Sequence, residues 1–216
     1  LPARQGLVFS AGVDATGLAY TVAGALGQVS QGITVQEGQV TLTGGGVFFA
    51  GQTVRTAAPG AALVFSGAAW DFYGNTVTFD AAAGAPITLN AISTTSGRGA
   101  NVVKNGPGLL SITGNATARG ISVAVNAGEL RLLAPNALFT SGYPASVAVH
   151  SGGTLSLSGG LTFANNPLTI SGSGGAGLGA LLSVSGANTW ARTVTLAAPA
   201  RISAAANTTL ELAPAS

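Results

Sequence analysis

The sequence predicts an all-β chain built as a parallel β-solenoid, and three observations support this fold class. Short segments that alternate apolar with small or polar residues recur along the chain, as in 40–43 and 155–157. Apolar residues with helical spacing are missing, so the chain shows the period of strands and not that of helices. A strand–turn–strand unit also repeats, and Gly128 and Gly153 occupy the same place in two copies that are 25 residues apart. Internal repetition at this period is typical of stacked coils.

Each expected strand has apolar residues at every second position, which gives it one face that can be buried. Gly-containing turns separate these segments, because a tight corner between short strands needs residues that tolerate positive φ. Near the C-terminus, Val194, Ile202 and Leu210 follow one another at eight-residue steps. The expected strands are 33–35, 40–42, 77–79, 87–89, 121–125, 130–132, 147–149, 155–157, 168–170, 194–196 and 210–212.

Stacking of coils explains the composition. Coils lie about 4.8 Å apart, so each inward side chain lies over an equivalent one and apolar residues are favoured there. At about 25 residues per coil, the 216 residues predict roughly eight or nine coils in a single elongated domain, 1–216. Residues 1–103 would form N-terminal coils of irregular repeat, and residues 104–216 would form the coils whose sequence resembles a known repeat. An antiparallel β-sandwich or jelly roll is the alternative fold, since it also has short, evenly spaced strands.

Charge and cysteine content exclude several classes of function. The chain has 8 Lys and Arg, 6 Asp and Glu and no cysteine, with a net charge of +2. Scattered positive charges give no footprint for nucleic acid, and zinc fingers, iron–sulfur clusters and disulfides need cysteine. The apolar runs are all far shorter than the roughly 20 residues of a membrane helix, so we expect no membrane insertion of this segment. No cofactor is predicted.

The second half resembles the passenger-associated β-strand repeat of bacterial autotransporters and giant surface proteins. The resemblance covers residues 104–212 and rests on the strings 106–115, 120–130 and 179–190. The last of these contains Ser-Gly-Ala-Asn-Thr followed by an aromatic residue, Trp190. Ala118 and Arg192 depart from the family pattern at corners. The resemblance implies a right-handed parallel β-helix displayed outside a Gram-negative-type cell, where such passengers typically lack cysteine.

The residues that could carry enzyme chemistry are few and scattered. The segment 172–177 matches G-x-G-x-x-G, but a strand follows it where the dinucleotide fingerprint needs a helix. His150 is the only histidine and is expected at the surface beside a turn. Asp71 and Asp80 are the only acids that could meet across a turn, as a carbohydrate-active β-helix enzyme would require. We therefore predict that the protein is not an enzyme.

Three interpretations of the function are considered: a structural protein, an adhesin and, least favoured, the carbohydrate-active enzyme. The first is preferred. The chain would be an extracellular structural protein that builds a fibre or matrix at the bacterial cell surface, as in a biofilm. It would associate with itself end to end, because uncapped terminal coils expose strand edges, or continue into further coils of a longer chain. The expected interface strands contain Leu7, Val8, Phe9, Leu210 and Leu212.

The alternative function is adhesion, with a passenger domain that binds surface glycans. Aromatic rings can stack on sugar rings, and the candidate contacts are Trp70, Phe72, Tyr73 and Trp190. The preferred interpretation of the cluster at 70–73 is a plug or cap at a coil corner. Arg98 and Lys104 flank the start of the second half, and we expect both to be solvated in an exposed loop.

Overall fold

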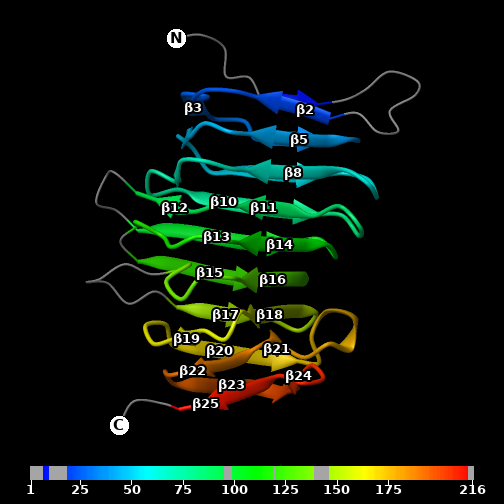
Figure 1. Cartoon of the computed structure of the whole chain (residues 1–216), viewed down its shortest axis with the longest axis vertical. Helices are drawn as coiled ribbons and strands as arrows, with labels where there is room; N and C mark the ends of the chain where they lie inside the picture. The colour runs from blue at the N-terminus through cyan, green and yellow to red at the C-terminus, as the bar shows by residue number, and fades with distance from the viewer. Residues whose placement is uncertain (1–6, 10–18, 95–98, 119, 139–145, 214–216) are drawn as a thin grey trace.

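The chain folds as a stack of β-coils, and all strand pairings are parallel in the part of the chain that the structure describes (Figure 1). The computed structural model describes residues 7–9, 19–94, 99–118, 120–138 and 146–213. The predicted parallel β-solenoid is therefore confirmed, and the antiparallel alternative is wrong. The stack runs continuously through residue 104, because β13 (Ala100–Asn105) pairs with strands on both sides.

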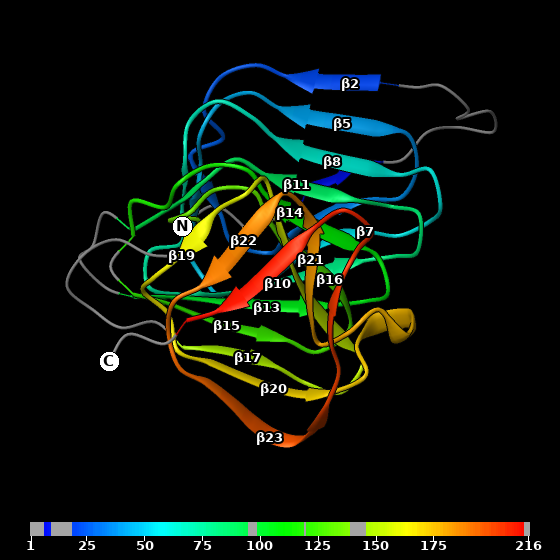
Figure 2. The same cartoon turned by 60° about the horizontal axis from the view of Figure 1, so that its bottom comes forward.

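Two nine-stranded sheets form the long sides of the stack (Figures 1 and 2). The first sheet contains, in spatial order, β1 (Leu7–Phe9), β4 (Ile33–Val35), β7 (Gln52–Thr56), β10 (Thr76–Ala81), β13, β15 (Ile121–Val125), β17 (Val147–Val149), β20 (Leu168–Gly172) and β23 (Val194–Ala200). The second sheet contains β2 (Ala19–Val22), β5 (Gln39–Leu42), β8 (Ala62–Phe65), β11 (Ile87–Leu89), β14 (Leu109–Ile112), β16 (Gly128–Leu132), β18 (Gly153–Ser158), β21 (Leu181–Ser185) and β24 (Ile202–Ala204).

The third side of the coil is shorter and is divided between the two halves. In the N-terminal half it consists of β3 (Gln28–Val29), β6 (Val47–Phe48), β9 (Trp70–Asp71) and β12 (Ile92–Ser93). In the C-terminal half it consists of β19 (Thr162–Phe163), β22 (Ala187–Trp190) and β25 (Thr209–Leu212). A single-turn 3₁₀ helix, η1 (Gly175–Gly177), lies in the connection between β20 and β21.

The core consists of columns of like side chains, as coil stacking requires. In the second sheet, one column lies in register from coil to coil and every member is buried. It contains Leu63, Ile87, Leu110, Leu130, Leu155 and Leu181. The N-terminal half adds an aromatic cluster in which Phe48 contacts Phe65, Trp70 and Phe72 with ring centroids 4.8–6.2 Å apart.

The repeat length read from the two glycines is confirmed, since Gly128 pairs in register with Gly153. At Gly153 the coils approach so closely that a Cβ atom would overlap the carbonyl group of Val125 in the preceding coil. We expect Gly153→Ala to lower the free energy of unfolding by about 1–3 kcal/mol, the usual cost of overpacking. Urea titration followed by circular dichroism would measure this.

The matched control for this change is Gly51→Ala. Around Gly51 the nearest heavy atom to an added Cβ is the Thr76 carbonyl oxygen, at an ordinary 3.6 Å. This variant should stay within about 0.5 kcal/mol of wild type. Equal stability of the two variants would contradict the close approach of coils at Gly153.

Candidate functional site

In the described structure, the last coil of the stack leaves a cross-section of the core uncovered at the C-terminal end. Leu196 lies in register beside the buried Ile170, and Ile202 beside the buried Leu181. Leu196 is nevertheless 59% exposed and Ile202 39% exposed, because no further coil covers them in the described structure. Within the described residues, three strands, β23, β24 and β25, are paired on one edge only. This end therefore offers both apolar side chains and free backbone hydrogen-bonding groups.

The residues predicted from the sequence for end contacts lie at the two ends of the stack. Leu7, Val8 and Phe9 form β1, the first strand of its sheet, although the side chains of β1 lie outside the described structure. In β25, the last strand of the third side, Leu212 lies in register beside the buried Trp190 and is 41% exposed, whereas Leu210 is half-buried. The sequence did not single out Leu196 and Ile202, although they belong to the same uncovered coil.

The structure buries three of the four aromatic residues that were candidates for glycan contact. Trp70 and Phe72 are fully buried in the N-terminal aromatic cluster, and Trp190 packs beside Phe163 with ring centroids 5.6 Å apart. A ligand at the surface cannot stack on these rings. These three rings are buried because their side chains point into the coil and pack on core residues of the neighbouring coils.

Tyr73 is the fourth candidate, and it remains at the surface. The residue is 39% exposed, and its ring stacks on that of Phe49, which is also exposed, with centroids 5.1 Å apart. The backbone at Tyr73 has φ +48°, and its N–H donates to the Asp71 carboxylate over 2.7 Å. Phe49 was not singled out from the sequence, because its neighbour in the next coil becomes visible only when the register is known.

The two acids considered for catalysis lie on different sides of the coil. Asp71 belongs to β9 on the third side and is buried, with its carboxylate bonded to the Tyr73 backbone. Asp80 belongs to β10 in the first sheet and forms an ion pair with Arg55, 3.6 Å away. The described residues contain no group of three or more histidine or acidic side chains that could hold a metal ion.

The other two motifs considered for chemistry also lie at corners. His150 is exposed at the end of β17, as the sequence predicts. The segment 172–177, which matches G-x-G-x-x-G, forms the corner between β20 and β21 and contains η1. The strand that follows, β21, replaces the helix that dinucleotide binding needs.

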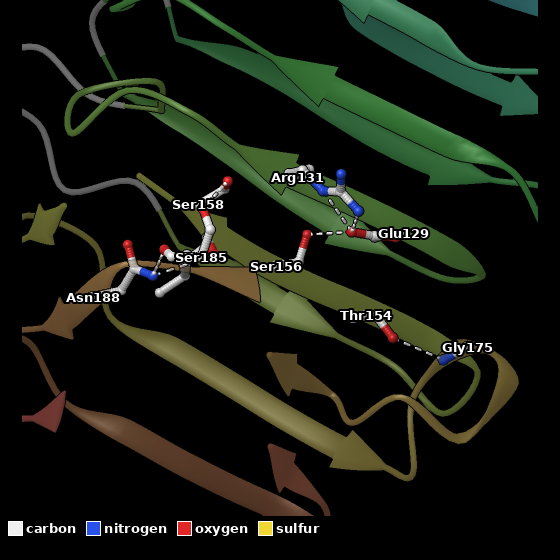
Figure 3. Close-up of polar contacts among 9 residues, drawn as sticks. Glu129, Arg131, Thr154, Ser156, Ser158, Gly175, Ser185 and Asn188 are labelled. Atoms are coloured by element: carbon white, nitrogen blue, oxygen red, sulfur yellow. Dashed lines mark hydrogen bonds and ion pairs between the residues drawn. The ribbon is translucent and has the colours of Figure 1, made fainter. Parts of the chain in front are cut away.

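A polar array on the outer face of the second sheet was missed by sequence reasoning (Figure 3). The Glu129 Oε1 atom accepts hydrogen bonds from Arg131 Nε and Nη2, at 2.9 and 2.7 Å, and from the Ser156 hydroxyl. Thr154 Oγ1 accepts from the Gly175 N–H at 2.9 Å. Thr154 and Ser156 are fully buried, so neither hydroxyl is accessible to a substrate. Asn188 of β22, drawn at the left of Figure 3 near Ser185, donates to the Ser183 hydroxyl and to the Ser185 carbonyl at 2.9 and 2.8 Å.

Lys104 contradicts the expectation of a solvated charge, since its side chain is fully buried. It occupies an inward column between Phe79 and Val125. Its Nζ atom donates to the carbonyl oxygens of Asn105, Gly106 and Ala127 at 2.7, 2.8 and 3.1 Å. Burial lowers the pKa of Lys104 to about 8, although the charges of Asp80 and Glu129 act in the opposite direction. Arg98 lies outside the described residues.

Comparison with known proteins adds no family assignment. No family model, no curated protein and no solved structure matches the chain. In the described part of the chain, no helix combines the length and the apolar composition that a bilayer span requires. The geometry of the stack, and above all its uncovered C-terminal end, is therefore the basis for a proposal about function.

Proposed function

We propose that this protein is a non-enzymatic structural subunit that associates end to end into a fibre or matrix outside a bacterial cell. The observation that carries the proposal is the C-terminal coil, in which residues that continue buried core columns are exposed, Leu196 by 59%. Covering them would remove apolar surface from water, which contributes roughly 25 cal/mol per Å². Free edges of parallel strands can also pair with further strands.

A second copy of the chain fits this end by its topology. Along the sequence, strands alternate between the first sheet, the second sheet and the third side, both in the first coil and in the last. The N-terminal strands β1, β2 and β3 could therefore extend β23, β24 and β25 in the same order and direction. The low charge of the chain, 14 charged residues in 216, opposes such stacking only weakly. The location outside the cell rests on the resemblance of residues 104–212 to the autotransporter passenger repeat.

Electron microscopy and light scattering over a range of protein concentrations test the assembly. We expect filaments of constant width that lengthen with concentration. Leu196→Glu should abolish them, because it places a charge in the column that must be covered. Leu133→Glu is the matched control, because Leu133 is also exposed, by 39%, but lies at the end of β16 in the middle of the stack.

Discrete rods of one length at every concentration would contradict end-to-end assembly, and so would equal loss of filaments in both variants. Circular dichroism would confirm that both variants keep their strands. The alternative is a longer parent chain, whose further coils would cover the same end. That arrangement would also give discrete rods.

Adhesion to glycans is a second candidate function, and the exposed pair Phe49–Tyr73 favours it. Exposed aromatic rings on a surface of low charge suit the apolar face of a sugar ring. A glycan array probed with wild type and Tyr73→Ala tests this idea. Loss of a bound glycan in the variant would support adhesion, and binding that does not change would contradict the role of Tyr73.

A further inference from the structure

A notch with a volume of about 450 Å³ lies at the corner between the two nine-stranded sheets. It arises from unequal corner lengths. The chain passes from β15 to β16 through residues 126–127 alone, and from β17 to β18 through 150–152. The connection between β20 and β21 runs over 173–180, so it projects beyond these tight corners and overhangs them (Figures 1 and 2). Ala127 and Gly152 thus lie on the floor of a recess.

The overhanging wall is held in place by hydrogen bonds. The Gly175 N–H donates to Thr154 Oγ1 at 2.9 Å, as Figure 3 shows. The Gly179 N–H donates to the Ser173 carbonyl at 2.8 Å, and Arg201 Nη1 donates to the Gly177 carbonyl at 2.8 Å. The notch therefore exists without a ligand, which lowers the cost of ordering on binding.

The side chains that line the notch are mostly apolar. Pro107 and Leu109 form one wall, and Leu178, which is 44% exposed, belongs to the opposite wall. Glu129 is the one charged residue among the lining residues. Among the described residues, all hydrogen bonds to its carboxylate go to Oε1, from Arg131 and Ser156. Its second oxygen is left to accept a further donor.

The backbone around the notch offers few free donors. The N–H groups of several lining residues already donate to other groups. They belong to Gly108, Ala127, Gly128, Glu129, Gly175 and Leu178. The Lys104 ammonium lies behind the floor, and its hydrogen bonds go to the carbonyl oxygens of Asn105, Gly106 and Ala127. A ligand must therefore bring its own donors.

We propose that this notch binds a small organic cation, with an ammonium group at Glu129 and an apolar body against Pro107, Leu109 and Leu178. Hydrogen bonds between ionised partners are about twice as strong as neutral ones, and the volume is within the range of small-molecule sites. Three positive groups belong to the elements around the notch. Arg131 is held by Glu129 Oε1, Arg201 donates to the Gly177 carbonyl, and Lys104 attracts both Asp80 and Glu129. This site is independent of assembly, because it lies in the middle of the stack.

Calorimetric titration with three probes that share one apolar body tests the proposal. We expect cyclohexylammonium to bind at least about tenfold more tightly than cyclohexanol, and cyclohexanecarboxylate to show no binding. In Glu129→Gln the preference for the cation should vanish. Ala127→Leu should abolish binding of both cyclohexylammonium and cyclohexanol, because the larger side chain fills the notch. Leu133→Ala, which removes an exposed leucine elsewhere, should bind like wild type.

Two outcomes would overturn the cation site. Equal affinity of wild type for the amine and the alcohol would show that Glu129 contributes nothing to recognition. Amine binding that survives Ala127→Leu, with strands intact by circular dichroism, would place the bound cation outside the notch.

Discussion

Replacement of Trp70 by alanine is expected to lower the free energy of unfolding by about 3–5 kcal/mol, the usual cost for a fully buried aromatic ring. The Trp70 ring packs against Phe48 and Phe65, each with centroids 4.8 Å away. Gly46 makes room for it, since a Cβ there would lie 2.7 Å from the indole ring. The loss would leave a cavity at the junction of two coils, where the neighbouring strands cannot close without breaking their register.

The control for this change is Tyr73→Ala, three residues away. Tyr73 is exposed, and its described ring contact is the stack on Phe49. We expect a cost below about 1.5 kcal/mol, the upper value for an aromatic pair. Urea titration with circular dichroism measures both variants, and Trp190 remains as a fluorescent reporter in the C-terminal half.

Hydrogen exchange would show where Trp70→Ala acts. Because stability in a stacked array is a sum over coils and their interfaces, the amides of β6, β8 and β9 should lose protection before those of β18 and β21. Wild-type stability of Trp70→Ala would contradict the buried position of the ring and would return Trp70 to the candidates for ligand contact.

The sequence was sufficient to predict the coil and its length, because both depend on local patterns. Alternation marks the strands, and the Gly128–Gly153 interval equals the register of the two coils. The burial of Trp70, Phe72 and Trp190 depends instead on whether each side chain points into the coil or out of it. The third side has strands of two to four residues, and a segment of this length has too few alternations to define an inner face.

The notch could not be predicted, although the residues that line it lie in visible turns or at the start of the strands that follow them. The notch is deep because the corner after β20 is longer than the corners after β15 and β17. This difference can be recognised only when the register of these three strands is known. Glu129 precedes the inward-facing Leu130, so the alternation predicts an outward side chain that is exposed to solvent. The structure shows that the Glu129 carboxylate is held by Arg131 of the same strand and by Ser156 of the next coil.

Lys104 is expected to make the stability of the protein rise with pH between about pH 8 and pH 10.5. Burial lowers the pKa of Lys104 in the folded state from 10.5 to about 8. Below pH 8 both states carry the proton, and the folded state bears the full cost of a buried charge. Between the two values the folded state has released the proton while the unfolded state still binds it, so rising pH favours folding. The full gain is about 3 kcal/mol.

The comparison that isolates this effect is Lys104→Met, measured at each pH. Lys104 is the only lysine in the chain, so the difference between the two proteins excludes tyrosine ionisation and all other titrating groups. Methionine fills the column between Phe79 and Val125 without a charge, and it leaves three carbonyl oxygens without their donor, at a cost that does not depend on pH. The wild-type curve should therefore climb relative to the variant from pH 8 to pH 10.5 and run parallel to it outside this window. Curves that stay parallel throughout would mean that the amine keeps its ordinary pKa, and that its three carbonyl contacts compensate fully for its burial.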